Sequence, residues 1–130
     1  MVPHFSFINK NNNMNLNLFT DFLTFIKIQH WVAAKHSHHT ILGDLYDSLD
    51  DKFDEFIECS LGLFQVSRVE IESNPIDAQM DLELHLKIMQ RYNEFHNKCK
   101  EIAGDNSALL SLLDDMTNIV SRACYLLKMK

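Results

Sequence analysis

The chain has few residues that interrupt regular secondary structure. Only three glycines and two prolines occur among its 130 residues, which leaves long unbroken segments and favours helices over many short strands. Hydrophobic residues make up 46% of the sequence, and such a fraction argues against disorder. The length suits one domain with one core and is too short for two ordinary domains. We therefore expect a single all-α domain.

Basic charge, paired cysteines and long apolar runs are also scarce. The 12 Lys and Arg stand against 18 Asp and Glu, a formal net charge of −6, so we expect no strong nucleic-acid binding, because phosphate contacts need clustered basic residues. No run of about eighteen apolar residues and no basic leader before an apolar core is present, so we expect an unprocessed, soluble protein that does not bind membranes. The three cysteines form no CxxC pair, which indicates reduced thiols in a cytoplasmic compartment.

Apolar residues at helical spacing predict four helices. The first is so rich in apolar positions that it must be buried on more than half of its circumference, by bundle neighbours or by a second subunit. Gly43 lies inside the second and costs roughly 1 kcal/mol there relative to Ala, so it indicates close packing or a nearby ligand. A polar tail at residues 1–15 precedes the helices, which are expected at residues 16–33, 38–60, 76–103 and 108–128.

The link between the second and third helices decides the predicted architecture. Residues 64–72 alternate like a short strand, but a single strand would have no partner in this chain, so an extended crossover is expected. A connection this long lets consecutive helices run parallel, as in ferritin-like bundles with one long crossover. Residues 16–130 are therefore predicted to form a ferritin-like four-helix bundle.

Residues 28–58 concentrate four of the seven histidines and a dense run of carboxylates. His30 shares a helical stripe with Phe19, Leu23 and Ile26, so we expect it to face the core, where it needs a partner. The carboxylates of the second helix form pairs one turn apart, and either pair can chelate an ion. Mixed nitrogen and oxygen ligands suit iron, zinc or manganese. The predicted metal ligands are His30, His39, Asp51, Asp54, Glu55 and Glu58.

A second interpretation of this stretch needs no metal. The second helix would carry a solvated acidic face, while His30 and Trp31 would be buried packing groups. The Glu-x-x-His motif that a self-contained di-iron centre requires on two helices is absent from the sequence. We therefore expect either a site shared between subunits or no metal site.

Weaker candidates lie elsewhere. Asp81 and His85 are one turn apart on the third helix and His96 follows, which would suit a second centre, although a lone histidine on a helix flank is more often only hydrogen-bonded. Asp115 is expected to pair with His85 or His30. No phosphate loop and no nucleophile elbow occurs, so we expect no nucleotide or organic cofactor and assign no catalytic residue.

One stretch resembles the DNA-protecting ferritins of starved bacterial cells. The resemblance covers roughly residues 19–60 and rests on His30-Trp31, a following histidine, and a helix of the type Leu-Tyr-x-x-Leu-Asp-x-x-x-Asp-Glu, here residues 45–55. It implies a ferritin-like fold, a hollow oligomer and ferroxidase-like oxidation of iron at sites shared by two subunits. The positions matching that family's ligands are His30, His36 or His39, Asp51 and Glu55.

Nearly the whole chain is similar to an uncharacterised family of short proteins from bacteriophages and large DNA viruses, which has a predicted ferritin-like fold. That family has no established activity, so the similarity supports the fold and implies a viral protein of the virion or the infected cytoplasm. It rests on His30-Trp31, Lys35-x-Ser37, His39, Tyr46, Asp51, Asp54, Glu58, Gly62, Asp114, Asp115 and Tyr125-Leu-Leu127.

Two functions follow from the sequence. The first is a small ferritin-like bundle that binds iron, or else zinc or manganese, and assembles as a homo-oligomer. The second is a non-catalytic viral structural or interaction module that keeps the fold without the metal and uses the apolar excess of its first helix to bind a viral or host protein.

Overall fold

The computed structural model describes residues 13–66, 68–73 and 83–129. In chain order these residues form a short strand β1 (Asn13–Asn15), helix α1 (Asn17–Val32), helix α2 (His36–Phe64), strand β2 (Arg68–Glu70), helix α3 (Leu84–Ala103) and helix α4 (Ser107–Met129). The prediction of an all-α protein with four helices is confirmed, apart from the two three-residue strands.

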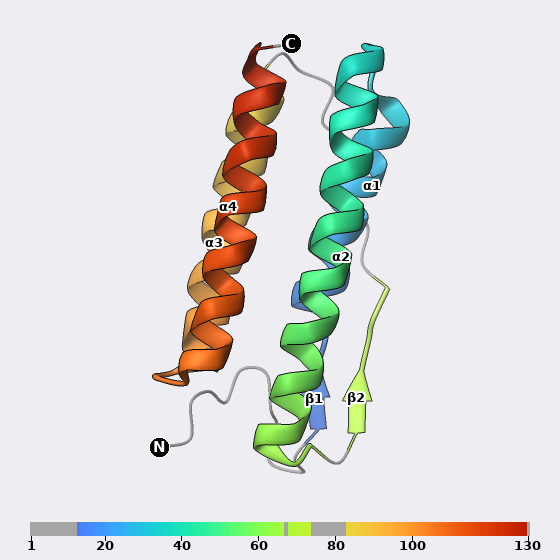
Figure 1. Ribbon diagram of the computed structural model, residues 1–130. Coiled ribbons are helices and arrows are strands. Elements are labelled where there is room, and N and C mark those ends of the chain that lie inside the picture. Colours follow the sequence, from blue (N-terminus) through green and yellow to red (C-terminus); the bar gives the residue numbers. More distant parts are fainter. Residues whose placement is uncertain (1–12, 67, 74–82, 130) are drawn as a thin grey trace.

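The four helices stand side by side with their axes nearly aligned (Figure 1). α1 and α2 run in opposite directions, as do α3 and α4, whereas α2 and α3 run in the same direction. α2 packs closely against α1 and α4, and α3 packs closely against α4. α1 and α3 touch at far fewer residues, so the face between these two helices is the least closed side of the bundle.

The core is formed by one apolar stripe from each helix. The helical spacing of apolar residues predicts an inward stripe on α2 and another on α3, and every residue of both stripes is buried. They are Leu42, Leu45, Leu49, Phe53 and Phe56 on α2, and Leu84, Ile88, Tyr92, Phe95, Cys99 and Ile102 on α3. At the centre, Phe53 and Phe95 stack with ring centroids 4.8 Å apart, and Phe22 stacks on Phe95 at 5.3 Å. Phe19 meets Phe53 and Phe95 edge to face at 5.4 and 5.5 Å. Such offset and edge-on contacts add to the stabilisation that burial provides.

Strand β2 has a partner, which the sequence did not reveal. β1 and β2 pair in parallel, with Met14 opposite Val69, and Met14 is fully buried. Next to the strands, the side-chain amide of Asn17 donates to the carbonyl of Glu72 at 2.6 Å and accepts from the backbone N–H of Glu72 at 2.7 Å. The expectation that a strand in the link would be unpaired is therefore wrong, because its partner lies at the end of the polar tail.

Residues 13–15 of the tail predicted at residues 1–15 thus belong to the folded unit, while residues 1–12 lie outside the described part of the chain. The long link also includes residues 74–82, which are not described either. No helix within the described ranges combines the length and apolarity needed to cross a lipid bilayer.

Helix ends follow the sequence signals in some places only. Gly104 ends α3 at a φ of 58°, which glycine adopts without steric cost, and the side chain of Asn106 accepts the backbone N–H of Leu109 at 3.0 Å, as expected for the N-cap of α4. α2 begins two residues earlier than predicted and continues through Gly62 to Phe64. Because glycine commonly ends helices, the sequence predicts that Gly62 stops α2. This prediction is wrong, since the chain leaves α2 only at Gln65, with a φ of 50°.

Candidate metal-binding site at the α1–α2 turn

The turn between α1 and α2 brings two histidines into direct contact. α1 ends at Val32 and α2 begins at His36, and because the two helices run in opposite directions, residues on either side of the turn face each other. The imidazole rings of His30 and His39 lie nearly parallel, with their centroids 3.9 Å apart and their planes at 22°. Two residues that the sequence singled out as ligands therefore form one pair.

Each ring of this pair is held by the backbone of the other residue. Nδ1 of His30 donates to the carbonyl oxygen of His39 at 2.7 Å, and Nδ1 of His39 donates to the carbonyl oxygen of His30 at 2.9 Å. A carbonyl oxygen only accepts hydrogen bonds, so the proton of each neutral ring is on Nδ1. Among the described residues, neither Nε2 atom has a hydrogen-bond partner, so each neutral ring keeps a lone pair on Nε2.

Gly43 makes room for the ring of His30. A Cβ atom added at Gly43 would lie 3.0 Å from Cε1 and 3.2 Å from Nδ1 of His30, closer than such atoms normally approach. The His30 ring thus rests on the backbone of α2, one turn beyond His39. Of the two explanations that the sequence allowed for this glycine, the structure supports close packing.

His30 does not face the core as predicted. It is half-buried on the flank of α1, and the inward position is taken by Gln29, which is 1% exposed. The buried stripe of α1 keeps Phe19 and Ile26 of the predicted stripe, but Phe22 and Gln29 take the places predicted for Leu23 and His30. α1 is apolar around most of its circumference, so its own sequence does not decide which stripe turns inward.

The other histidines of the turn have different roles. His36 is exposed, and its ring lies 6.4 Å from that of His39, with planes at 25°. Nε2 of His38 donates to the carbonyl oxygen of Leu127 at 3.1 Å and so ties the start of α2 to the end of α4. Neither residue therefore completes a three-histidine metal site with the His30–His39 pair.

An aromatic and cationic cluster borders the pair. The ammonium group of Lys27 lies 4.7 Å from the ring centroid of Tyr46 and 5.8 Å from that of Trp31, within the range of a cation–π contact. Trp31 is 67% exposed, so the interpretation of this residue as a buried packing group is wrong. As the only tryptophan in the sequence, it is a built-in fluorescence probe beside His30.

The predicted carboxylate ligands do not join the histidines within one chain. α2 rises about 1.5 Å per residue, so Asp51 lies about 18 Å and Glu58 about 29 Å from His39 along the helix. These two carboxylates, with Asp54 and Glu55, are exposed on α2. No group of three or more His, Cys, Asp or Glu side chains suited to a metal ion occurs in the part of the chain that is described.

The acidic face of α2 has its own electrostatics. Burial, followed by the neighbouring carboxylates of Asp54, Asp51 and Asp47, raises the pKa of Asp50. Lys52 lies 3.8 Å from the carboxylate of Glu55 and 3.4 Å from that of Asp115 on α4. This face is therefore largely solvated and is bridged to α4 by one lysine.

Those of the weaker candidates on α3 and α4 that the structure describes are not brought together. Asp115 pairs with Lys52 and not with His85 or His30 as predicted. His96 packs beside the ring of Tyr92 at 5.7 Å, and burial, followed by the charge of Lys100, lowers the pKa of His96. The remaining candidate, Asp81, lies outside the described residues.

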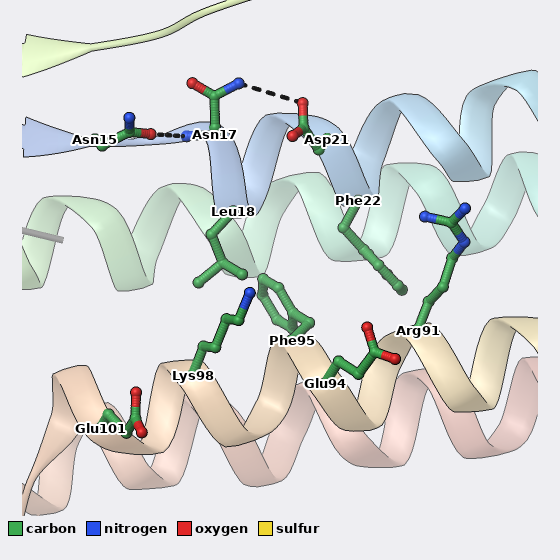
Figure 2. A pocket seen from close by; sticks show the side chains of 10 residues that line it. All are labelled: Asn15, Asn17, Leu18, Asp21, Phe22, Arg91, Glu94, Phe95, Lys98 and Glu101. Carbon is green, nitrogen blue, oxygen red and sulfur yellow. Dashed lines mark hydrogen bonds between the residues drawn. The ribbon is translucent and has the colours of Figure 1, made fainter. Parts of the chain in front are cut away.

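A groove that the sequence analysis missed runs between α1 and α3. It has a volume of about 400 Å³ and an apolar floor that includes Phe22 and Phe95. Figure 2 shows Arg91, Glu94 and Lys98 extending from α3 toward α1 along this groove. In the sequence, the charged residues of α3 look like an ordinary solvated helix face. The groove could not be predicted from them, because it forms only where α1 lies alongside α3.

Comparison with protein families identifies a family of unknown function. Residues 30–127 match the model of a family of unknown function, DUF5856. The matched range begins at His30 and includes all six predicted metal ligands. No curated protein and no solved structure matches the chain.

Proposed function

We propose a metal-binding function for this chain, which belongs to the family of unknown function DUF5856: a ferritin-like bundle that binds a divalent transition-metal ion through Nε2 of His30 and of His39. The observation that carries this proposal is the reciprocal pair of hydrogen bonds from Nδ1 of each ring to the carbonyl of the other residue. Histidines that bind metals commonly donate the second ring N–H to a carbonyl or carboxylate, which fixes the tautomer and the ring orientation.

The lone pair on each Nε2 lies in its ring plane and the two rings are stacked, so in our proposal one ring turns out of the stack for both nitrogens to bind one ion. Two imidazole nitrogens still leave that ion with open positions. Iron, zinc and manganese in proteins take four to six ligands, of which carboxylates are common partners of histidine. Metal–ligand distances are about 2 Å, so the four predicted carboxylate ligands, which lie about 18 Å or more from His39 along the same helix, do not reach this pair. In our proposal, Asp51, Asp54, Glu55 or Glu58 of a second copy completes the site.

An antiparallel arrangement of two α2 helices would satisfy this geometry. It places the acidic second half of one α2 beside the histidine-bearing first half of the other, and the same contact occurs twice around a two-fold axis. A bound iron would supply one-electron chemistry toward oxygen or peroxide. The protein's own contribution would be to orient the two imidazoles and to bring carboxylates to the ion.

The ferritin-like assignment is part of the same proposal. It is supported by the parallel directions of α2 and α3 (Figure 1) and by the long connection between Phe64 and Leu84. Consecutive parallel helices require such a crossover, and ferritin-like bundles have one. Viral origin and location in a virion or infected cytoplasm stay predictions from the resemblance.

Metal titration of chelator-treated protein tests the proposal. Binding of Co²⁺, Zn²⁺ and anaerobic Fe²⁺ is measured by calorimetry, with Trp31 fluorescence as a second readout. We expect His30→Ala and His39→Ala each to weaken binding by about tenfold or more, and His96→Gln, a matched change on α3, to leave it unaltered. Binding that is equally strong in the His30→Ala/His39→Ala double variant would refute the proposed ligands.

A separate variant tests the contribution of the second copy. Asp51→Asn/Glu55→Gln should weaken binding only at protein concentrations where the metal-loaded protein is dimeric by light scattering. Equal affinity at all concentrations would show that the ion is held by the histidines without these carboxylates.

The competing function is an interaction module without metal. It is favoured by the exposure of all four predicted carboxylate ligands and by the 67% exposure of Trp31, since a large exposed aromatic side chain commonly contributes to a protein interface. If less than about a tenth of an equivalent of metal stays bound after loading, this second function is the one to pursue.

A further inference from the structure

The face formed by α1 and α3 is open and polar. The groove of about 400 Å³ between these helices is continued along α3 by a second hollow of about 310 Å³. The floor residues Phe22 and Phe95 are only 6% and 3% exposed, so they are already covered within one chain. Recognition at this face therefore depends on the charged side chains that form its wall.

Four exposed residues on α3 form a stripe of alternating charge, Arg91, Glu94, Lys98 and Glu101, which we call the charge stripe. Their spacings of three, four and three residues place them within an arc of about 80° on a helix with 100° per residue. Figure 2 shows all four on the side of α3 next to the groove. Read along the helix, the charges alternate as plus, minus, plus, minus.

The charge stripe is complementary in charge to the same stripe of a second copy that runs in the opposite direction. Arg91 and Glu101 lie about 15 Å apart along the helix, Glu94 and Lys98 lie about 6 Å apart, and the two spacings share one midpoint. A two-fold axis through this midpoint sets Arg91 opposite Glu101 of the second copy and Glu94 opposite Lys98 of the second copy, each twice. A parallel pairing in register would instead place like charges opposite each other.

We propose that the charge stripe joins two copies of this chain through an antiparallel contact between their α3 helices. The guanidinium of Arg91 already lies 4.2 Å from the ring centroid of Phe25, which holds it in place and leaves its in-plane N–H groups available to a carboxylate. This surface is separate from the His30–His39 pair, and the contact requires no metal ion.

The contact is weak and sensitive to salt. Exposed ion pairs contribute little affinity individually and chiefly set register and orientation, so we expect a dissociation constant on the order of 100 µM at low ionic strength. Salt at about 0.5 M reduces the range of such charges to a few ångströms and is expected to dissociate the dimer.

Analytical ultracentrifugation of the metal-free protein in the presence of a chelator tests the proposal. Glu94→Lys and Lys98→Glu, each alone, set like charges opposite each other and are expected to weaken dimerisation by tenfold or more. An equimolar mixture of these two variants restores opposite charges and is expected to form a heterodimer. The swapped variant Glu94→Lys/Lys98→Glu is expected to dimerise like the native chain.

Matched controls make the same charge changes away from this face, as Asp114→Lys and Lys128→Glu, both exposed on α4, and circular dichroism verifies the fold of every variant. A native chain that stays monomeric at about 1 mM overturns the proposal. So does a dimer that the two α3 variants leave intact, or one that the control variants disrupt equally. Loss of metal binding in the histidine variants affects only the proposed function, because the ultracentrifugation is performed without metal.

Discussion

Replacing Gly43 with alanine tests whether the His30 ring rests on α2. In a helix interior, a change from glycine to alanine stabilises the fold by about 0.5–1 kcal/mol. Here the new Cβ would meet Cε1 of His30 at 3.0 Å, so the ring must move. Its 2.7 Å hydrogen bond to the carbonyl of His39 would then lengthen, and a hydrogen bond of this kind contributes about 0.5–1.5 kcal/mol. We expect Gly43→Ala to be neutral or to destabilise the protein by up to about 1 kcal/mol.

Gly62 provides the matched control, because it lies in the same helix and no described side chain comes within 4 Å of a Cβ added there. Gly62→Ala should raise the free energy of unfolding by about 0.5–1 kcal/mol. Gly43→Ala should do the same once His30 has been changed to alanine. The double-mutant cycle between Gly43→Ala and His30→Ala is therefore expected to give a coupling energy of about 1 kcal/mol or more.

Urea unfolding followed by circular dichroism measures these differences, and a change of about 1 kcal/mol corresponds to a shift of several degrees in Tm. If Gly43→Ala stabilises the native protein as much as Gly62→Ala does, the ring of His30 does not lie over Gly43. The pairing of His30 with His39 would then have to be abandoned, together with the metal site built on it.

Three further predictions concern the bundle. His38→Ala removes the hydrogen bond to the carbonyl of Leu127 and should cost about 0.5–1.5 kcal/mol, with faster hydrogen exchange confined to the end of α4. Asn106→Ala removes the N-cap of α4 and should lower stability by about 1 kcal/mol in urea unfolding. Burial, opposed by the hydrogen bond with Thr117, raises the pKa of Tyr92 to about 12. The folded state therefore holds the phenol proton more tightly than the unfolded state, so this contribution to stability is present below about pH 10 and is lost toward pH 12. Tyr92→Phe should reduce this decrease in the free energy of unfolding, as measured by urea unfolding across the same pH range.

The inward faces of α2 and α3 were predictable because each has one clear apolar stripe flanked by charged residues. Leu42, Phe53, Ile88 and Phe95 fall on these stripes and are buried as predicted. A helix that is apolar on one side only can be placed against a core without knowledge of its neighbours. The number of helices was accessible for the same reason.

α1 and the link were predicted less well. Apolar residues surround most of α1, so whether His30 or Gln29 faces inward depends on where α2 and α3 lie. The partner of strand β2 is Met14 and its neighbours, more than fifty residues earlier in the sequence. Pairing at that separation is a property of the folded chain and leaves no local sequence signal.

The candidate site, too, was predictable from the sequence only in part. Its residue types, imidazoles followed by carboxylates, are evident in the sequence, and the short turn before His36 is enough to bring His30 and His39 to the same end of the bundle. Which of these groups meet was decided by the tertiary structure. The antiparallel packing of α1 on α2 stacks two rings over Gly43, while the straight rise of α2 carries Asp51 and the later carboxylates away from them. The sequence therefore determines which chemical groups the site can contain, whereas the directions of the rigid helices determine which of these groups lie close together.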